Sequence, residues 1–146
     1  MIIRVRRRMT HRRYVDELEG RHGSIARLRK RASKHPDLRP LLAEWEWLAG
    51  HPERADEVIA VDRTMVFHQL ERFLEVITPQ RLRMLRYLRE HPETDSLSEL
   101  ARALDRDYRN VHADAEKLAS VGAIELESKA NRVVPRVLAD SIEVEV

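Results

Sequence analysis

Residues 96–128, SLSELARALDRDYRNVHADAEKLASVGAIELES, restrict the fold of this chain more than any other stretch. Ser96 and Glu99 have the spacing of a capping box, in which each side chain accepts a hydrogen bond from a backbone N–H at the helix start. Asp107 has the residue type of a helix N-cap, and Gly122 can take the positive φ that ends a helix. The stretch therefore predicts two short amphipathic helices, a tight turn between them and a strand after the second. This order is typical of an element that inserts one helix end into a DNA groove.

The segments on either side extend this pattern. Thr78 and Pro79 have the residue types of an N-cap and a first helical position, and leucines follow at helical spacing as far as His91 and Pro92. After the second helix, AIELES and NRVVPRV have the pattern of two strands, and SIEVEV alternates as a half-buried strand does. Three helices followed by a strand pair form the winged-helix arrangement. We therefore expect a mainly α fold with a small β-hairpin wing (α+β), in which a winged helix-turn-helix domain follows a helical N-terminal extension.

The same region resembles a known group of regulators. The segments TPQRLRMLRYL, SLSELARALDRDYRNVHADAEKLASVGAIE and IEVEV are similar to the winged helix-turn-helix regulators of the MarR-like superfamily. They are closest to a prokaryotic branch described as DNA-binding proteins, and DRDYRNVHADAEKL is the most specific part of the match. The preceding VFHQLERFLEVI is similar to that branch's lead-in, so the resemblance runs from Val66 to the end of the chain.

The resemblance implies a function. Members of this branch often lie beside toxin genes and act as antitoxins that also bind their own operator, and AEWEWLAGHPERADEVI is similar to the part of such antitoxins that precedes the DNA-binding domain. It thus implies a sequence-specific transcriptional regulator of double-stranded DNA, an autorepressor, which is also a candidate antitoxin with a cognate toxin as partner. We expect a homodimer, because one recognition helix offers few base contacts and two half-sites about 34 Å apart multiply the discrimination.

The second helix of the stretch presents candidate DNA contacts. If Val111, Ala115 and Leu118 face the core, the amino-terminal turns face outward, toward base edges. Arg109 can form a bidentate contact with guanine, and Asn110 can do so with adenine unless it closes a capping interaction instead. The predicted DNA-binding residues of this helix and the turn before it are Arg106, Tyr108, Arg109, Asn110, His112, Ala113 and Lys117.

The hairpin tip and the charges near the turn leave alternatives open. Lys129, Asn131 and Arg132 at the predicted tip are further DNA-binding candidates in the minor groove, or they form an ordinary polar turn. The helix pair could also be a scaffold for protein contacts, because acidic side chains are unfavourable near phosphates. Three acidic residues lie in or beside the turn: Asp105, Asp107 and Asp114. Four basic residues around it favour DNA: Arg102, Arg106, Arg109 and Lys117.

The first part of the chain differs from the rest in charge. Residues 1–35 carry 12 Lys/Arg and 3 Asp/Glu, a balance of +9, whereas residues 36–78 carry 4 and 9. A basic arm can bind nucleic-acid phosphates or an acidic partner, and it can equally be a solvated, partly disordered tail. We assign residues 1–62 to a helical, basic-then-acidic extension for dimer or partner binding, and residues 63–146 to the winged helix-turn-helix DNA-binding domain.

A candidate interface comes from apolar residues that recur at helical spacing in three segments, 38–49, 55–59 and 66–77. Trp45 and Trp47 lie about 200° apart around a helix, so both cannot face one core stripe. We expect Trp47 at an edge, against a partner, or packed on a neighbouring segment of its own chain. The predicted partner or dimer interface comprises Leu41, Trp45, Trp47, Leu48, Phe67, Leu70 and Phe73. In a competing interpretation, the chain is a non-enzymatic interaction module that neutralises a partner toxin through residues 1–60, with the winged helix as scaffold.

Enzyme activity, metal sites and cofactors are not expected. The chain has no cysteine, no Gly-rich phosphate loop and no His-Glu-x-x-His motif, and its seven histidines include no pair at i, i+4. No apolar run approaches the roughly 18 residues of a membrane-spanning helix. The lack of cysteine fits the reducing cytoplasm, where we expect the protein to act.

Overall fold

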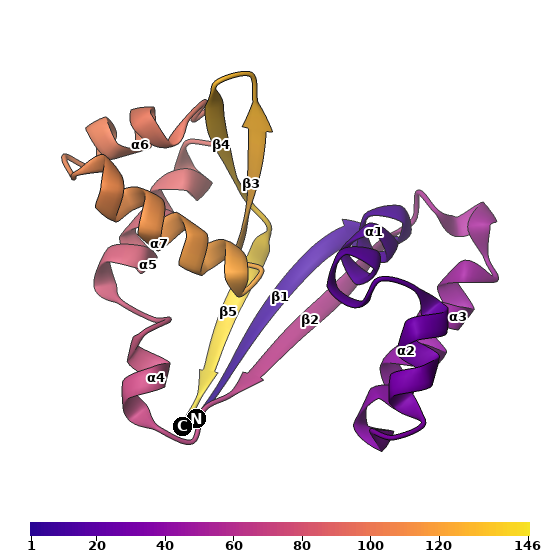
Figure 1. The fold of residues 1–146 in the computed structure, drawn as a ribbon. Helices are drawn as coiled ribbons and strands as arrows, with labels where there is room; N and C mark the ends of the chain where they lie inside the picture. Colours follow the sequence, from indigo (N-terminus) through magenta and orange to yellow (C-terminus); the bar gives the residue numbers. More distant parts are fainter. The chain divides into compact units, whose positions relative to one another are not determined.

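A computed structural model describes residues 1–146 and divides the chain into two compact units. One unit combines Met1–Arg7 with Val61–Val146, and the other is Arg8–Ala60 (Figure 1). Helices hold 51% of the residues and strands 25%, in two sheets, so the fold is α+β. The expectation of a mainly α protein with one small hairpin and a helical N-terminal extension is therefore wrong. The missing element is a sheet built from both ends of the chain.

This three-stranded sheet has the order β2-β1-β5. Its strands are β1 (Ile2–Thr10), β2 (Val58–Val66) and β5 (Ala139–Glu145). The central strand β1 pairs antiparallel with β5, with Ile3 opposite Val144 and Val5 opposite Ile142. Ile3 and Val5 are fully buried, whereas Arg4 and Arg6 lie on the other face. The period-2 alternation of β1 thus buries one face of the strand.

The arginines of β1 are bound within the sheet rather than held out as a basic arm. Arg6 makes a two-point ion pair with Asp62 of β2, at 3.1 and 3.4 Å, and approaches Glu143 of β5 at 3.7 Å. Arg4 also reaches Glu143, at 3.3 Å. The hydrogen bond and charge of Asp62, followed by the charge of Glu143, raise the pKa of Arg6. The alternative of a disordered tail is therefore wrong, because residues 2–32 form β1 and two helices, and binding of phosphates or of an acidic partner by the basic segment stays a prediction.

Residues 58–66 are a second correction, because helical spacing was expected for Val58 and Ile59 and from Val66 onward. The helical turn after Pro52 is only a 3-10 segment, Pro52–Arg54, and strand β2 follows it. The stretch VIAVDRTMV is rich in β-branched residues and finds a hydrogen-bonding partner in β1.

The rest of this unit follows the predicted order of helices and strands. The elements are α4 (Leu70–Leu74), α5 (Pro79–Glu90), α6 (Leu97–Ala103), α7 (Tyr108–Ser120), β3 (Ile124–Lys129) and β4 (Arg132–Val137). Strands β3 and β4 form an antiparallel hairpin. One core joins the sheet to the helices, and its fully or nearly fully buried members include Ile3, Val5, Met84, Leu97, Leu100, Val111, Ala115, Leu118 and Ile124.

Local capping signals fix these helix ends as the sequence predicts. Thr78 Oγ1 accepts from the N–H of Arg81 at 3.2 Å, and Ser96 Oγ accepts from Glu99 at 3.0 Å. The capping box is modified, because the Glu99 carboxylate accepts from the N–H of Asp95 at 3.0 Å rather than from that of Ser96. Gly122 takes a φ of 78° after α7.

The unit Arg8–Ala60 is helical after the end of β1. It contains α1 (His11–His22), α2 (Ile25–Ala32), the 3-10 turn Pro36–Leu38, α3 (Arg39–Ala49) and the 3-10 turn Pro52–Arg54. Tyr14, Leu18 and Leu28 are buried, and the Tyr14 hydroxyl donates to Glu44 at 3.1 Å. Burial first, and the charge of Glu44 second, raise the pKa of Tyr14.

The predicted partner interface is corrected for two of its residues. Trp45 and Leu48 lie in the core of the Arg8–Ala60 unit, so they are not accessible to a second chain. Trp47 is 44% exposed and stacks on His51 with ring centroids 4.2 Å apart, so it lies at an edge and packs partly on its own chain. Leu41 is half-buried.

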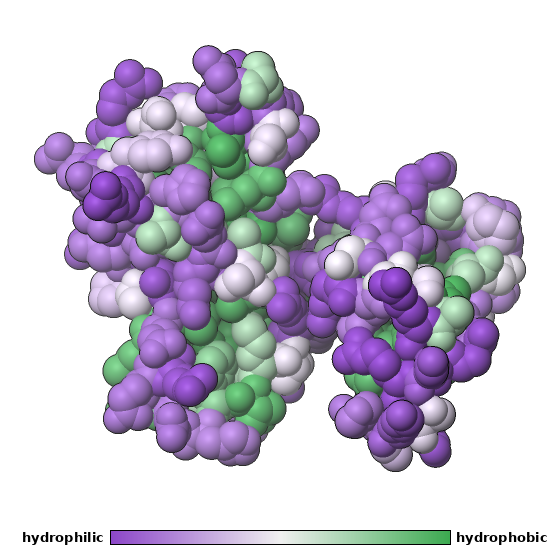
Figure 2. Space-filling view, in the orientation of Figure 1, coloured by the Kyte–Doolittle hydropathy of each residue, from purple (hydrophilic) through white to green (hydrophobic).

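The other predicted interface residues belong to the larger unit. Phe67 and Phe73 are half-buried and meet edge-on, with centroids 6.0 Å apart, whereas Leu70 is 53% exposed. Figure 2 shows hydrophobic residues at the surface near α4. Exposed apolar side chains of this unit include Val66, Leu70, Leu74 and Val144. None of the helices is both long enough and apolar enough to span a membrane.

Replacing Gly122 by alanine is expected to destabilise the larger unit. A Cβ at this position would lie 3.2 Å from Nη1 of the buried Arg7, and the φ of 78° is unfavourable for alanine. We expect the free energy of unfolding to fall by about 1–2 kcal/mol, measured by urea denaturation. Gly20→Ala is the matched control, because open space surrounds Gly20 within α1. An unchanged stability of Gly122→Ala would contradict this account of the α7 end.

Candidate nucleic-acid interface

The turn between α6 and α7 has a defined hydrogen-bond pattern. The N–H of Arg106 donates to the carbonyl of Ala101 at 3.0 Å, and that of Asp105 donates to Arg102 at 3.1 Å. Asp105 has a φ of 50°. These are the paired bonds and the left-handed residue of a Schellman motif, a position that aspartate tolerates better than most side chains. The left-handed backbone conformation of this turn therefore explains the aspartate at position 105.

Helix α7 begins directly after this turn, with Asp107 as its N-cap. Asp107 Oδ1 accepts from the N–H of Arg109 at 2.7 Å. Asn110 is exposed and its side chain makes no hydrogen bond, so the capping alternative for Asn110 does not apply. Val111, Ala115 and Leu118 are buried as predicted, which turns Tyr108 and Arg109 toward solvent.

Asp114 of α7 is held between two arginines. Its Oδ1 lies 3.0 Å from Arg81 Nε, and its Oδ2 lies 2.9 Å from Arg106 Nη1. The three side chains are only 13–20% exposed. Arg81 also donates to the carbonyls of Glu75 and Val76, so this cluster ties α5, the end of α4, the turn and α7 together. Arg106, which was predicted to contact DNA, therefore forms an ion pair with Asp114.

The remaining predicted residues of α7 lie on or near its outward face. Tyr108 is 47% exposed, and its ring lies 5.8 Å from that of His112. His112 is half-buried, and its Nδ1 lies 3.7 Å from Glu116. Ala113 is exposed, and Lys117 is half-buried with no ion pair.

The hairpin tip carries the last three predicted residues, all exposed. Lys129 lies 3.8 Å from Glu127, and Arg132 lies 3.3 Å from Asp95, the residue before the N-cap of α6. Asn131 follows Ala130, whose φ is 52°. Both cations of the tip thus have an acidic neighbour. Figure 1 shows this tip and the start of α7 at the end of the unit away from the chain termini.

The ion pairs leave a specific set of cations free. Within the larger unit, Arg4, Arg6, Arg81, Arg106 and Arg132 all bind carboxylates. By contrast, three basic side chains of α6 and α7 make no ion pair or hydrogen bond: Arg102, Arg109 and Lys117. Arg102 and Arg109 thus place free positive charge beside the turn, and Lys117 adds a third free charge in the last turn of α7.

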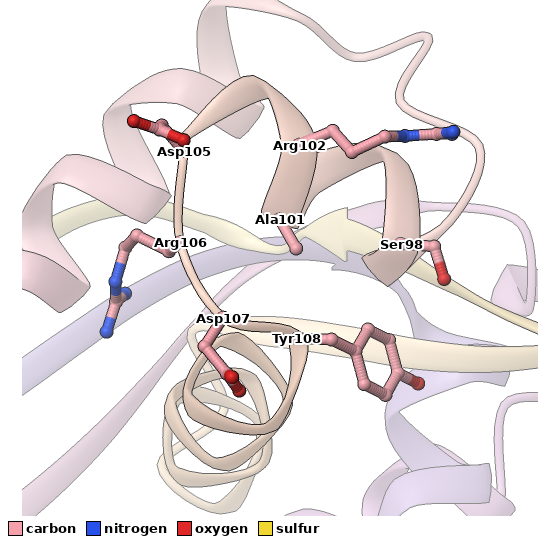
Figure 3. A pocket seen from close by; sticks show the side chains of 7 residues that line it. All are labelled: Ser98, Ala101, Arg102, Asp105, Arg106, Asp107 and Tyr108. Atoms are coloured by element: carbon pink, nitrogen blue, oxygen red, sulfur yellow. The ribbon is translucent and has the colours of Figure 1, made fainter.

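A groove of about 590 Å³ lies between α6 and the start of α7. Its lining comprises Ser98, Ala101, Arg102, Asp105, Arg106, Asp107 and Tyr108. Figure 3 shows Ser98, Arg102 and Tyr108 extending to one side of the turn, whereas Asp105 and Arg106 point to the other. The sequence predictions do not include Ser98 and Arg102 as contacts. Their i, i+4 spacing on the exposed face of α6 is a signal that could have identified them.

The family model HVO_A0114 matches residues 76–144, a little under half of the chain. The matched segment runs from just before α5 to the end of β5, so it includes the turn and the groove. Its designation states no activity. No curated protein matches the chain.

Neutralising Asp114 is expected to loosen the α6–α7 arrangement. In Asp114→Asn, Arg81 and Arg106 lose their anion while remaining mostly buried, which should lower the free energy of unfolding by about 1–3 kcal/mol in a denaturation experiment. Asp95→Asn is the control, because its pair with Arg132 is about half exposed and should contribute less than about 1 kcal/mol. Equal effects of the two substitutions would show that the cluster does not stabilise the unit.

Proposed function

We propose that the unit formed by Met1–Arg7 and Val61–Val146 binds double-stranded DNA, with the first turns of α7 in the major groove. The supporting observation is the division of α7 into two faces. Val111, Ala115 and Leu118 are buried, whereas Arg109 and Asn110 are exposed and unpaired. Both free side chains have the chemistry that distinguishes base pairs in the major groove.

The roles of the individual side chains follow from their donors and positions. Arg109 would donate two hydrogen bonds to guanine, and the Asn110 amide would pair with adenine. Ala113, one turn further along the exposed face, leaves room for a thymine methyl. Lys117 is further still from the helix start and suits a backbone phosphate. Arg106 orients α7 through Asp114 and makes no DNA contact in this proposal.

The biological role in this proposal is sequence-specific repression, including repression of the protein's own gene, in the cytoplasm. The resemblance to MarR-like winged helix-turn-helix regulators supports it, and the same resemblance supports a cognate toxin as a partner. A homodimer would place two copies of α7 on two half-sites. The exposed apolar side chains Val66, Leu70 and Leu74 offer a surface for that dimer, in place of the buried Trp45 and Leu48.

A second candidate function is neutralisation of a partner toxin through residues 1–60, chiefly the segment Arg8–Ala60, with the winged helix as scaffold. One observation favours it: this segment forms a compact unit of its own, with Trp47 half exposed beside His51 and Arg54. Under this alternative, Trp47→Ala would abolish partner binding and Arg109→Ala would have no effect.

Arg109→Ala tests the principal proposal. On a duplex selected by the protein from a random-sequence pool, we expect the Kd to rise by a factor corresponding to about 1–3 kcal/mol, because a bidentate base contact is lost. The Kd for a scrambled duplex of the same length should rise less, so the ratio between the two Kd values should become smaller than in the wild type. Both are measured by fluorescence anisotropy titration.

Two further variants complete the experiment. Lys117→Ala should weaken both duplexes alike and lower the slope of log K against log salt concentration by about one unit. Arg86→Ala is the matched control, because Arg86 is exposed on α5 and paired with Glu90. Wild-type affinities for Arg109→Ala on both duplexes would refute the assignment of α7 as the reading helix.

A further inference from the structure

Three polar side chains line the α6–α7 groove and face the same way. Ser98 and Arg102 lie one turn apart on α6, and Tyr108 is the first residue of α7. Figure 3 shows the Ser98 hydroxyl, the Arg102 guanidinium and the Tyr108 hydroxyl on one side of the turn. The Schellman turn fixes the two helices relative to each other, so these groups stand on rigid elements.

None of the three polar groups has a partner within the protein. The side chains of Ser98 and Arg102 make no hydrogen bond or ion pair, and the Tyr108 hydroxyl makes no hydrogen bond, although its ring lies beside that of His112. The neighbouring Arg106 differs in this respect, because Asp114 binds it. One free guanidinium and two free hydroxyls, with Ser98 between Arg102 and Tyr108 in Figure 3, are a set of donors for an anionic oxygen.

We propose that Ser98, Arg102 and Tyr108 bind one phosphodiester group of the DNA backbone, an inference that rests on the proposed function. The groove is open to solvent, as a site for a group on a long polymer must be. Arg102 supplies charge-assisted hydrogen bonds, and the two hydroxyls can donate to the remaining oxygen. Tyr108 precedes Arg109 in α7, so the phosphate contact would fix how deeply Arg109 enters the major groove of the DNA.

The acidic residues of the groove favour a diester over a free phosphate. Asp107 is occupied by the N–H of Arg109, and Asp105 points away from the three donors. Their negative charge nevertheless opposes any anion, and it opposes a dianion about twice as strongly as a monoanion. A backbone phosphodiester carries one negative charge, whereas a phosphomonoester carries about 1.5 to 2 at neutral pH and inorganic phosphate is a mixture of monoanion and dianion.

The decisive variant is Arg102→Gln, which keeps most of the side-chain length and removes the charge. We expect the Kd for the selected duplex and that for the scrambled duplex to rise by the same factor, about tenfold, because phosphate contacts carry no sequence information. The slope of log K against log salt concentration should fall by about one unit. Tyr108→Phe and Ser98→Ala should each cost about twofold to fivefold on both duplexes and leave the slope unchanged, since neither removes a charge. Arg86→Gln is the control for the loss of charge.

The outcomes separate this inference from the proposed function. If Arg102→Gln binds both duplexes as the wild type does while Arg109→Ala loses preference, DNA reading by α7 stands and the phosphate site is wrong. If Arg102→Gln weakens only the selected duplex, Arg102 contacts a base and the inference is also wrong. Failure of the wild type to bind either duplex overturns both.

A titration with inorganic phosphate distinguishes the source of the anion. We expect amide NMR shifts around Ser98 and Arg102 to respond no more to phosphate than to sodium chloride of equal ionic strength. Saturable shifts that vanish in Arg102→Gln would identify a free phosphate as the ligand and overturn the backbone assignment.

Discussion

The pairing of Asp114 with Arg81 and Arg106 is the interaction on which the candidate interface depends. A carboxylate that is 13% exposed is costly unless it is paired, and here each oxygen has its own guanidinium. Because Arg81 also binds the carbonyls that end α4, rotation of α7 about its axis would break contacts to several elements at once. The outward direction of Arg109 and Asn110 is therefore set by this cluster together with the buried face of α7. The cluster also determines which cations remain free to bind a ligand, because Arg81 and Arg106 are paired with Asp114.

How much the sequence could predict depended on how local the signals were. Ser96, Asp107 and Gly122 act within a few residues of themselves, and the helix ends they indicated agree with the structure. The sheet is different. The strand in SIEVEV was predicted from its alternation, but β1 and β5 lie at opposite ends of the chain, so no local signal identified β1 as its partner. In β1 the alternation is also masked, since the inward-facing position after Ile3 and Val5 is the buried Arg7. A buried arginine in a basic segment gives no sequence signal that separates a strand from a solvated arm.

The sequence predicted which helices form the candidate site, but it did not predict which of their charged side chains are paired. Arg102 and Arg106 are four residues apart around one turn, and sequence reasoning placed both near DNA. Between them the chain reverses direction at Asp105, so their side chains leave on opposite sides of the turn. One guanidinium lies against Asp114 and the other stays free, which only the tertiary structure can decide. The three aspartates that argued against DNA have structural roles as well. Asp105 takes the left-handed position, Asp107 caps α7, and Asp114 is neutralised by two arginines.

The small number of free cations limits how a single copy could bind. Arg102, Arg109 and Lys117 would release counterions at three phosphates at most, or at two if Arg109 reads a base. With about 0.9 ion released per phosphate, the salt slope of one copy would be only about −2 to −3. The Lys129 and Arg132 charges add little, because each already has an acidic neighbour. Under the proposed function, a homodimer would add contacts to those that this surface of one copy supplies. In the proposed dimer, two copies on two half-sites would double both the phosphate contacts and the base contacts, and the exposed apolar residues around Leu70 would form the proposed dimer surface.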